Sequence, residues 1–71
     1  MIIKSDIAGS VWKIEVAPGQ AVEEGAVLMI LESMKMEIPV EAPCAGRVAE
    51  ILVSEGQTII EGQPLAALNP R

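Results

Sequence analysis

The segment Glu32-Ser33-Met34-Lys35-Met36 holds the side chain best placed for chemistry in this chain. Lys35 carries an amine on a long flexible stem, and a methionine lies on each side of it. The pattern predicts a hairpin tip at 33–37 that lacks the Gly, Asn or Asp preferred in two-residue turns. A tight turn without these residues stores backbone strain, and strain tends to be retained where function needs it.

Two plainer interpretations of this segment stay open when only the residue types are considered. Methionine is commonly a filler of cores, so Met34 and Met36 could be core residues, although a hairpin tip offers them no core to fill. Lys35 could be an ordinary solvated lysine, which is the default for this residue type.

The composition of the chain argues against catalysis by the chain itself. The 71 residues include no His, one Cys, four Ser and one Thr, so neither a nucleophile–base pair nor a set of zinc ligands can be assembled. We therefore predict no catalytic residue and no metal site. The net charge of −5 argues against nucleic acid as a partner, because phosphate backbones bind to clustered Lys and Arg.

The cysteine count and the apolar runs indicate the cellular setting. Cys44 is the single cysteine and cannot form an internal disulfide, so we expect a cytoplasmic protein in which Cys44 is a small buried hydrophobe. The longest apolar run, Ala26 to Leu31, has six residues and is far too short to span a membrane. A soluble chain without membrane contact is predicted.

The sequence contains two copies of one pattern, offset by 37 residues. Residues 7–32 align with residues 44–69, with eleven identities in twenty-six positions. Three of the identities are glycine pairs, namely Gly9/Gly46, Gly19/Gly56 and Gly25/Gly62. The segment 33–43 between the copies has no visible counterpart except the chain ends. Such a repeat predicts one domain over 1–71 with two equivalent halves.

Each copy has the pattern of strand, turn, short strand, turn and strand, and no stretch supports a helix. The positions predicted to face inward alternate with the rest: Trp12, Ile14 and Val16, then Ala49, Ile51 and Val53. The turns are predicted to need positive φ at Gly19, Gly25, Gly56 and Gly62. We predict an all-β fold, a flattened β-barrel or sandwich of two sheets with an internal pseudo-two-fold axis. Pro39 and Pro43 predict an edge strand after the tip.

The offset also places the tip relative to the chain ends. The counterpart of Lys35 would be position 72, one step beyond Arg71. The two-fold axis therefore predicts that Lys35 and the termini lie at opposite ends of the domain. A group attached to Lys35 would project away from whatever the termini join.

The segment Glu32–Met36 resembles the E-(A/S)-M-K-M signature of biotin carboxyl carrier domains. The family has a biotinyl/lipoyl fold, a barrel-sandwich hybrid with a similar two-fold repeat, so the resemblance covers nearly the whole chain. The run Gly9–Lys13 and the run Glu32–Val40 are similar to those of urea-carboxylase-type carriers and of small stand-alone biotin/lipoyl attachment proteins. This chain has Ser33 where many signatures have Ala.

The resemblance implies a non-catalytic carrier in which biotin is joined to Lys35 by an amide. A biotin protein ligase would attach the biotin. Met34 and Met36 would contribute to recognition by the ligase or to carboxylation of the attached ring, and Glu32 would favour one ligase over another. The carboxybiotin arm would then shuttle carboxylate from a biotin carboxylase to a carboxyltransferase.

Two alternatives to the biotin carrier belong to other functional classes. A lipoyl carrier has a similar fold with the modified lysine at the same tip, but that lysine is usually preceded by Asp and followed by a small residue, unlike Met34 and Met36. An unmodified β-sandwich that only mediates contacts would need no reactive Lys35.

Overall fold

Eight strands and no helix form the fold, and the computed structural model describes all 71 residues. The all-β prediction is confirmed. The chain accordingly contains no helix that is long and apolar enough to cross a membrane. In chain order the strands are β1 (Ile2–Lys4), β2 (Gly9–Ile14), β3 (Ala21–Val22), β4 (Val27–Ser33), β5 (Met36–Glu41), β6 (Gly46–Ile51), β7 (Thr58–Ile59) and β8 (Pro64–Pro70).

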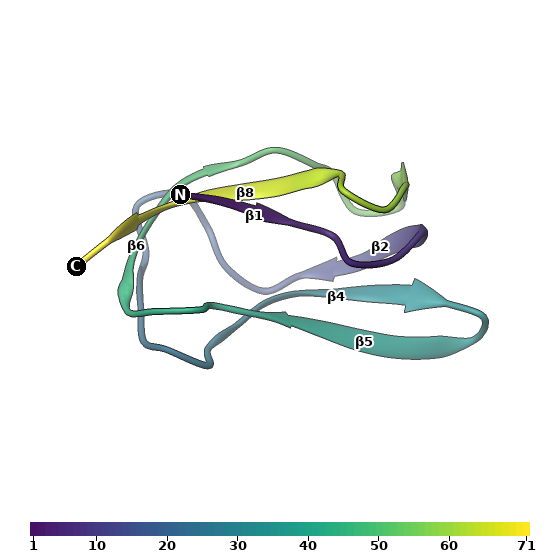
Figure 1. Cartoon of the computed structure of the whole chain (residues 1–71), viewed down its shortest axis with the longest axis horizontal. Coiled ribbons are helices and arrows are strands. Elements are labelled where there is room, and N and C mark those ends of the chain that lie inside the picture. Colours follow the sequence, from purple (N-terminus) through teal and green to yellow (C-terminus); the bar gives the residue numbers. More distant parts are fainter.

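Two four-stranded antiparallel sheets form the layers, with strand orders β1-β8-β6-β3 and β5-β4-β2-β7 (Figure 1). Each sheet combines strands from both halves of the repeat, because β3 pairs with β6 and β7 pairs with β2. The two pairings are equivalent: adding or subtracting 37 converts Val22↔Gly46 into Ile59↔Gly9. The predicted pseudo-two-fold sandwich is thus present, and each four-stranded sheet needs strands from both halves.

The structural repeat is longer than the repeat visible in the sequence. β1 pairs with β8 through Ile3↔Ala66, and β5 pairs with β4 through the equivalent Val40↔Met29. Residues 39–41 are therefore the counterpart of residues 2–4. No identity marks the correspondence, because these strands lie at sheet edges, where backbone pairing on one side suffices and side chains are less constrained. The edge position predicted for the strand containing Pro39 is confirmed.

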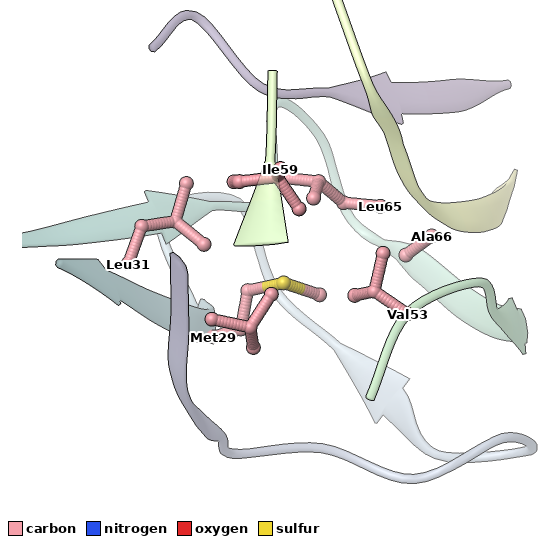
Figure 2. Close-up of a cluster of buried hydrophobic side chains, with 7 residues drawn as sticks. Met29, Leu31, Val53, Ile59, Leu65 and Ala66 are labelled. Carbon is pink, nitrogen blue, oxygen red and sulfur yellow. The ribbon is translucent and has the colours of Figure 1, made fainter. Parts of the chain in front are cut away.

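The core consists of two apolar clusters without any Phe or Tyr. One cluster joins seven buried side chains, most of them shown in Figure 2: Val11, Met29, Leu31, Val53, Ile59, Leu65 and Ala66. The other joins Ile3, Val22, Leu28, Ala42, Val48 and Leu68. Each cluster contains residues from both halves. Burial of each large side chain contributes about 1.5–3 kcal/mol, and this stabilisation is obtained only when the two halves pack together.

The predicted inward alternation is wrong at Trp12 and Ala49. Val11 and Val48 are buried instead, whereas Trp12 is 49% exposed. The reason is a register shift in each half, between Val11 and Lys13 and at the equivalent place in β6. One extra residue at a bulge reverses which side chains face the core.

The glycines of the repeat serve two different purposes. The predicted positive φ is confirmed at the four turn glycines, with φ of 85–89°: Gly19, Gly25, Gly56 and Gly62. Gly9 and Gly46 have no positive φ, but a Cβ at either would overlap the backbone carbonyl of a neighbouring strand, Glu32 or Asn69 respectively. This close approach of neighbouring strands at Gly9 and Gly46 was not predicted from the sequence.

Candidate functional site

The tip that carries Lys35 is a two-residue hairpin turn between β4 and β5. Ser33 pairs with Met36, which leaves Met34 and Lys35 as the turn residues. Their φ angles are 53° and 64°, and they are the only non-glycine residues of the chain with positive φ. Positive φ at both central residues is what the twist of a two-residue hairpin requires. The predicted strain at the tip is thus confirmed.

The strands below the turn hold it in this conformation. Two residue pairs below the pair that closes the turn, Leu31 pairs with Ile38, and Leu31 is 1% exposed within the core. A slip of one residue would move Leu31 out of the core, so the register is fixed by burial. The left-handed conformation costs about 1–2 kcal/mol for each non-glycine residue, and core packing of β4 offsets that cost.

We expect that Met34→Gly stabilises the domain. Glycine takes positive φ without the steric cost, and part of the gain is lost to the greater freedom of glycine in the unfolded chain. The expected net increase in the free energy of unfolding is about 0.5–1 kcal/mol, which corresponds to a rise in Tm of about 2–8 °C for a domain of this size. Thermal unfolding followed by circular dichroism checks this. Met36→Gly, at a strand position, should lower Tm. If both variants changed Tm equally, the turn at Met34 would not be strained.

The side chains at the tip are exposed and uncommitted. Met34 is 91% exposed and Met36 is 61% exposed, so neither fills the core. Lys35 is also exposed, and it takes part in no ion pair or side-chain hydrogen bond. Its amine is therefore available to a reagent that approaches from outside the domain.

Two carboxylates flank the tip on neighbouring strands. Glu32 in β4 lies directly opposite Glu37 in β5, and both are exposed. Like charges opposite each other in a sheet are unfavourable, so this pair does not stabilise the hairpin. Glu32 was predicted from the sequence as a site residue, whereas Glu37 was not. The two-residue turn would have revealed it, because that register places 32 across from 37.

The tip lies at one end of the elongated molecule, and the termini lie toward the other (Figure 1). The amino group of Met1 donates a hydrogen bond to the Leu68 carbonyl at 2.9 Å, and the Leu68 N–H donates to Met1 at 2.8 Å. The opposite placement predicted from the 37-residue offset is confirmed. An attached group on Lys35 extends away from the chain ends.

Neither hollow of the surface lies at the tip. A groove of about 440 Å³ runs between edge strands β1 and β5 and is lined by residues such as Ile3 and Val40. A second hollow of about 360 Å³ lies near Arg47 and Arg71, at the end of the termini. No three His, Cys, Asp or Glu residues are grouped so that they could hold a metal ion, and Cys44 is partly buried against the core. The candidate site is thus a projecting amine.

A family model described as "Biotin-requiring enzyme" matches residues 1–68. The chain belongs to this biotin/lipoyl family. Among curated proteins it is 42% identical over 69 residues to the biotin/lipoyl attachment protein of Bacillus subtilis, covering 97% of this chain and 94% of that one. It is also 42% identical over 67 residues to the biotinylated protein TB7.3 homolog of Mycobacterium leprae, covering 94% of each.

Solved structures of the biotin/lipoyl family have the same fold. The urea carboxylase of Kluyveromyces lactis matches with a TM-score of 0.92 and 33% identity, over 97% of this chain and 6% of that chain. The lipoyl domain of the 2-oxoglutarate dehydrogenase complex from Azotobacter vinelandii matches with a TM-score of 0.83 and 29% identity, over 97% and 95%. The predicted resemblance to attachment proteins and to urea-carboxylase-type carriers is confirmed.

Proposed function

We propose that this domain is a biotin carboxyl carrier in which biotin is joined covalently to Lys35. The observation that carries the proposal is the exposed, unpaired amine of Lys35 on a strained turn between two exposed methionines. Membership of the biotin/lipoyl family and the names of the relatives support a carrier of biotin without catalysis of its own.

The geometry of the tip fits a covalently attached group. Attachment would join Lys35 Nζ to the biotin carboxyl carbon by an amide: the bond between that carbon and the oxygen of AMP breaks, AMP leaves with the bonding electrons, and the amine gives up one proton to solvent. The amide is neutral, so the finished arm is easier to desolvate in a partner's active site than an ammonium. When bound, biotin supplies a ring nitrogen that accepts carboxylate and passes it on.

The residues of this chain position the arm and leave the chemistry to the partners. The rigid β4–β5 hairpin keeps the attachment point away from the core, while the lysine stem supplies flexible reach. Tethering replaces free diffusion by an effective concentration that the linker sets. The partners would be a biotin protein ligase for loading, then a biotin carboxylase and a carboxyltransferase. The lack of an internal disulfide supports a cytoplasmic setting.

The intact mass after incubation with biotin protein ligase, biotin and ATP tests the proposal, together with a tryptic map. We expect the mass of the protein to increase by one biotinyl group. We also expect a tryptic peptide spanning Ile14 to Arg47, because trypsin does not cleave after an acylated Lys35. Unmodified protein would instead yield two peptides that meet at Lys35 and Met36. Unchanged mass with normal cleavage after Lys35 would overturn the proposal.

A lipoyl carrier is the second candidate, favoured by the structural match to a lipoyl domain. The residues beside the lysine favour biotin, since methionines occupy both sides. Incubation with lipoate ligase and lipoate separates the two: we expect no mass change with lipoate. Modification by lipoate and not by biotin would support the second candidate. Modification by neither would favour the unmodified β-sandwich that only mediates contacts.

A further inference from the structure

Ile60 is an exposed apolar residue at the same end of the molecule as Lys35. It lies in the turn between β7 and β8 and is 67% exposed, the second most exposed large apolar side chain after Met34. Figure 1 shows the turn that leads into β8 at the end where the β4–β5 tip projects. Its neighbour Ile59 is only 1% exposed, so Ile60 is the residue of the two that faces outward.

The internal two-fold axis shows that the turn does not need an apolar residue there. The equivalent of Ile60 is Glu23, in the turn between β3 and β4 at the opposite end. Both turns have the same backbone hydrogen bond, from Gln63 to Ile60 at 3.0 Å and from Ala26 to Glu23 at 3.0 Å. The same conformation thus accepts a glutamate, and folding gives no reason for an exposed isoleucine.

The strand pairing places Ile60 beside the tip. Ile59 in β7 pairs with Gly9 in β2, and a Cβ on Gly9 would lie 3.3 Å from the Ser33 side chain, one residue before Met34. Two strand spacings of about 4.8 Å separate β7 from β4, so the distance between Ile60 and the base of the tip is about 10 Å.

The two-fold axis relates the two ends a second time. Met34 is the equivalent of Arg71, and Arg71 forms an ion pair with Glu23 at 2.5 Å. In the 37-residue alignment, Met34 and Ile60 therefore correspond to the two members of an oppositely charged pair at the other end. The end with Lys35 has two exposed apolar side chains where the end with the termini has a salt bridge.

We infer that Ile60, together with Met34, forms an apolar contact surface for the enzyme that acylates Lys35, an inference that rests on the proposed function. Before loading, the Lys35 amine reaches only about 6 Å from its Cα, so the enzyme must press against the tip itself. A standard interface buries about 800 Å² on each partner, which is a patch of about 16 Å radius. Such a patch centred on Lys35 covers Ile60.

The acylating enzyme is a better occupant than an enzyme that acts on the loaded arm. Once biotin is attached, the reactive ring lies a full arm length beyond the Lys35 amine, so a second enzyme can act on it without covering Ile60. The ligase acts on the Lys35 amine itself, before any arm separates the reacting group from the tip. We therefore assign this surface to the biotin protein ligase, and we expect the matching ligase surface to be apolar.

The experiment compares the steady-state kinetics of biotinylation by biotin protein ligase for the wild type, Ile60→Glu and Glu23→Ile. Ile60→Glu gives the tip end the residue of the opposite end, so we expect it to fold with an unchanged circular dichroism spectrum. Its KM for the domain should rise about tenfold with kcat retained, as for loss of an interface contact. Glu23→Ile should stay within twofold of the wild type, and Ile60→Leu should restore most of the binding.

Each result bears on the inference separately from the proposed function. A folded Ile60→Glu variant with wild-type KM would overturn the inference while a biotinylated wild type upholds the carrier role. A wild type that is not biotinylated at all would instead remove the proposed function. Ile60→Glu protein loaded with excess ligase should be carboxylated by biotin carboxylase at the wild-type rate. Impaired carboxylation beside normal loading would assign the surface to the carboxylase and contradict our choice.

Discussion

Lys35→Arg is expected to abolish biotin incorporation while leaving the domain folded. The guanidinium keeps the positive charge but stays protonated, so it cannot act as the nucleophile that forms the amide. Lys35 is exposed and makes no ion pair or side-chain hydrogen bond, so the change in the free energy of unfolding should stay within about 0.5 kcal/mol. Intact mass after incubation with ligase, biotin and ATP measures incorporation, and thermal unfolding measures stability.

Lys4→Arg is the matched control for this result. Lys4 is also exposed, but it lies in β1, away from the hairpin turn. Its substitution should leave incorporation at one biotin per chain. If Lys35→Arg still gained a full biotin, the attachment point would lie elsewhere, and a tryptic map would identify it.

Gly46→Val is expected to have the largest effect on stability. The new Cβ would overlap the carbonyl oxygen of Asn69 and lie 3.0 Å from the Pro70 Cα, and both are backbone groups of β8 that cannot rotate aside. β6 and β8 would have to separate where Gly46 pairs with Pro70. Such overpacking costs about 3 kcal/mol or more, a large part of the total stability of a small domain. Urea unfolding followed by tryptophan fluorescence measures the loss.

Gly56→Ala separates this steric effect from the backbone effect. Gly56 has a φ of 86° and open space around its Cα, so alanine there meets strain but no clash. We expect a cost of about 1–2 kcal/mol, clearly smaller than that of Gly46→Val. If Gly46→Val unfolded at the urea concentration of the wild type, the strands would be further apart than the structure shows.

Most of the fold could be predicted from the repeat and the two-residue period. The repeat predicted two equivalent halves, and the glycine pairs predicted the turns. The bulges could not be predicted, because no residue type marks the extra position after Val11, and the error at Trp12 follows from that. The equivalence of β1 and β5 also escaped the sequence, because edge pairing between backbones leaves no shared side chains.

The candidate site was predictable where the local sequence determines it. Lys35 and its strained turn follow from a short loop without glycine between two strands. Glu37 needed the register of the hairpin, and Ile60 needed the strand order that brings β7 beside β2. The spacing of residues in the sequence does not predict which distant residues become neighbours across a sheet.

The hydrogen-bonded neighbours Met1 and Leu68 make this topology almost circular. They are the two-fold equivalents of Ile38 and Leu31, which are joined through a connection of six residues. Three residues already follow Leu68, so a linker of only three more between Arg71 and Met1 would close the chain into a ring with a second hairpin turn. A circularly permuted domain could then begin at another turn. A lysine in the new turn would create a two-armed carrier whose arms point in opposite directions.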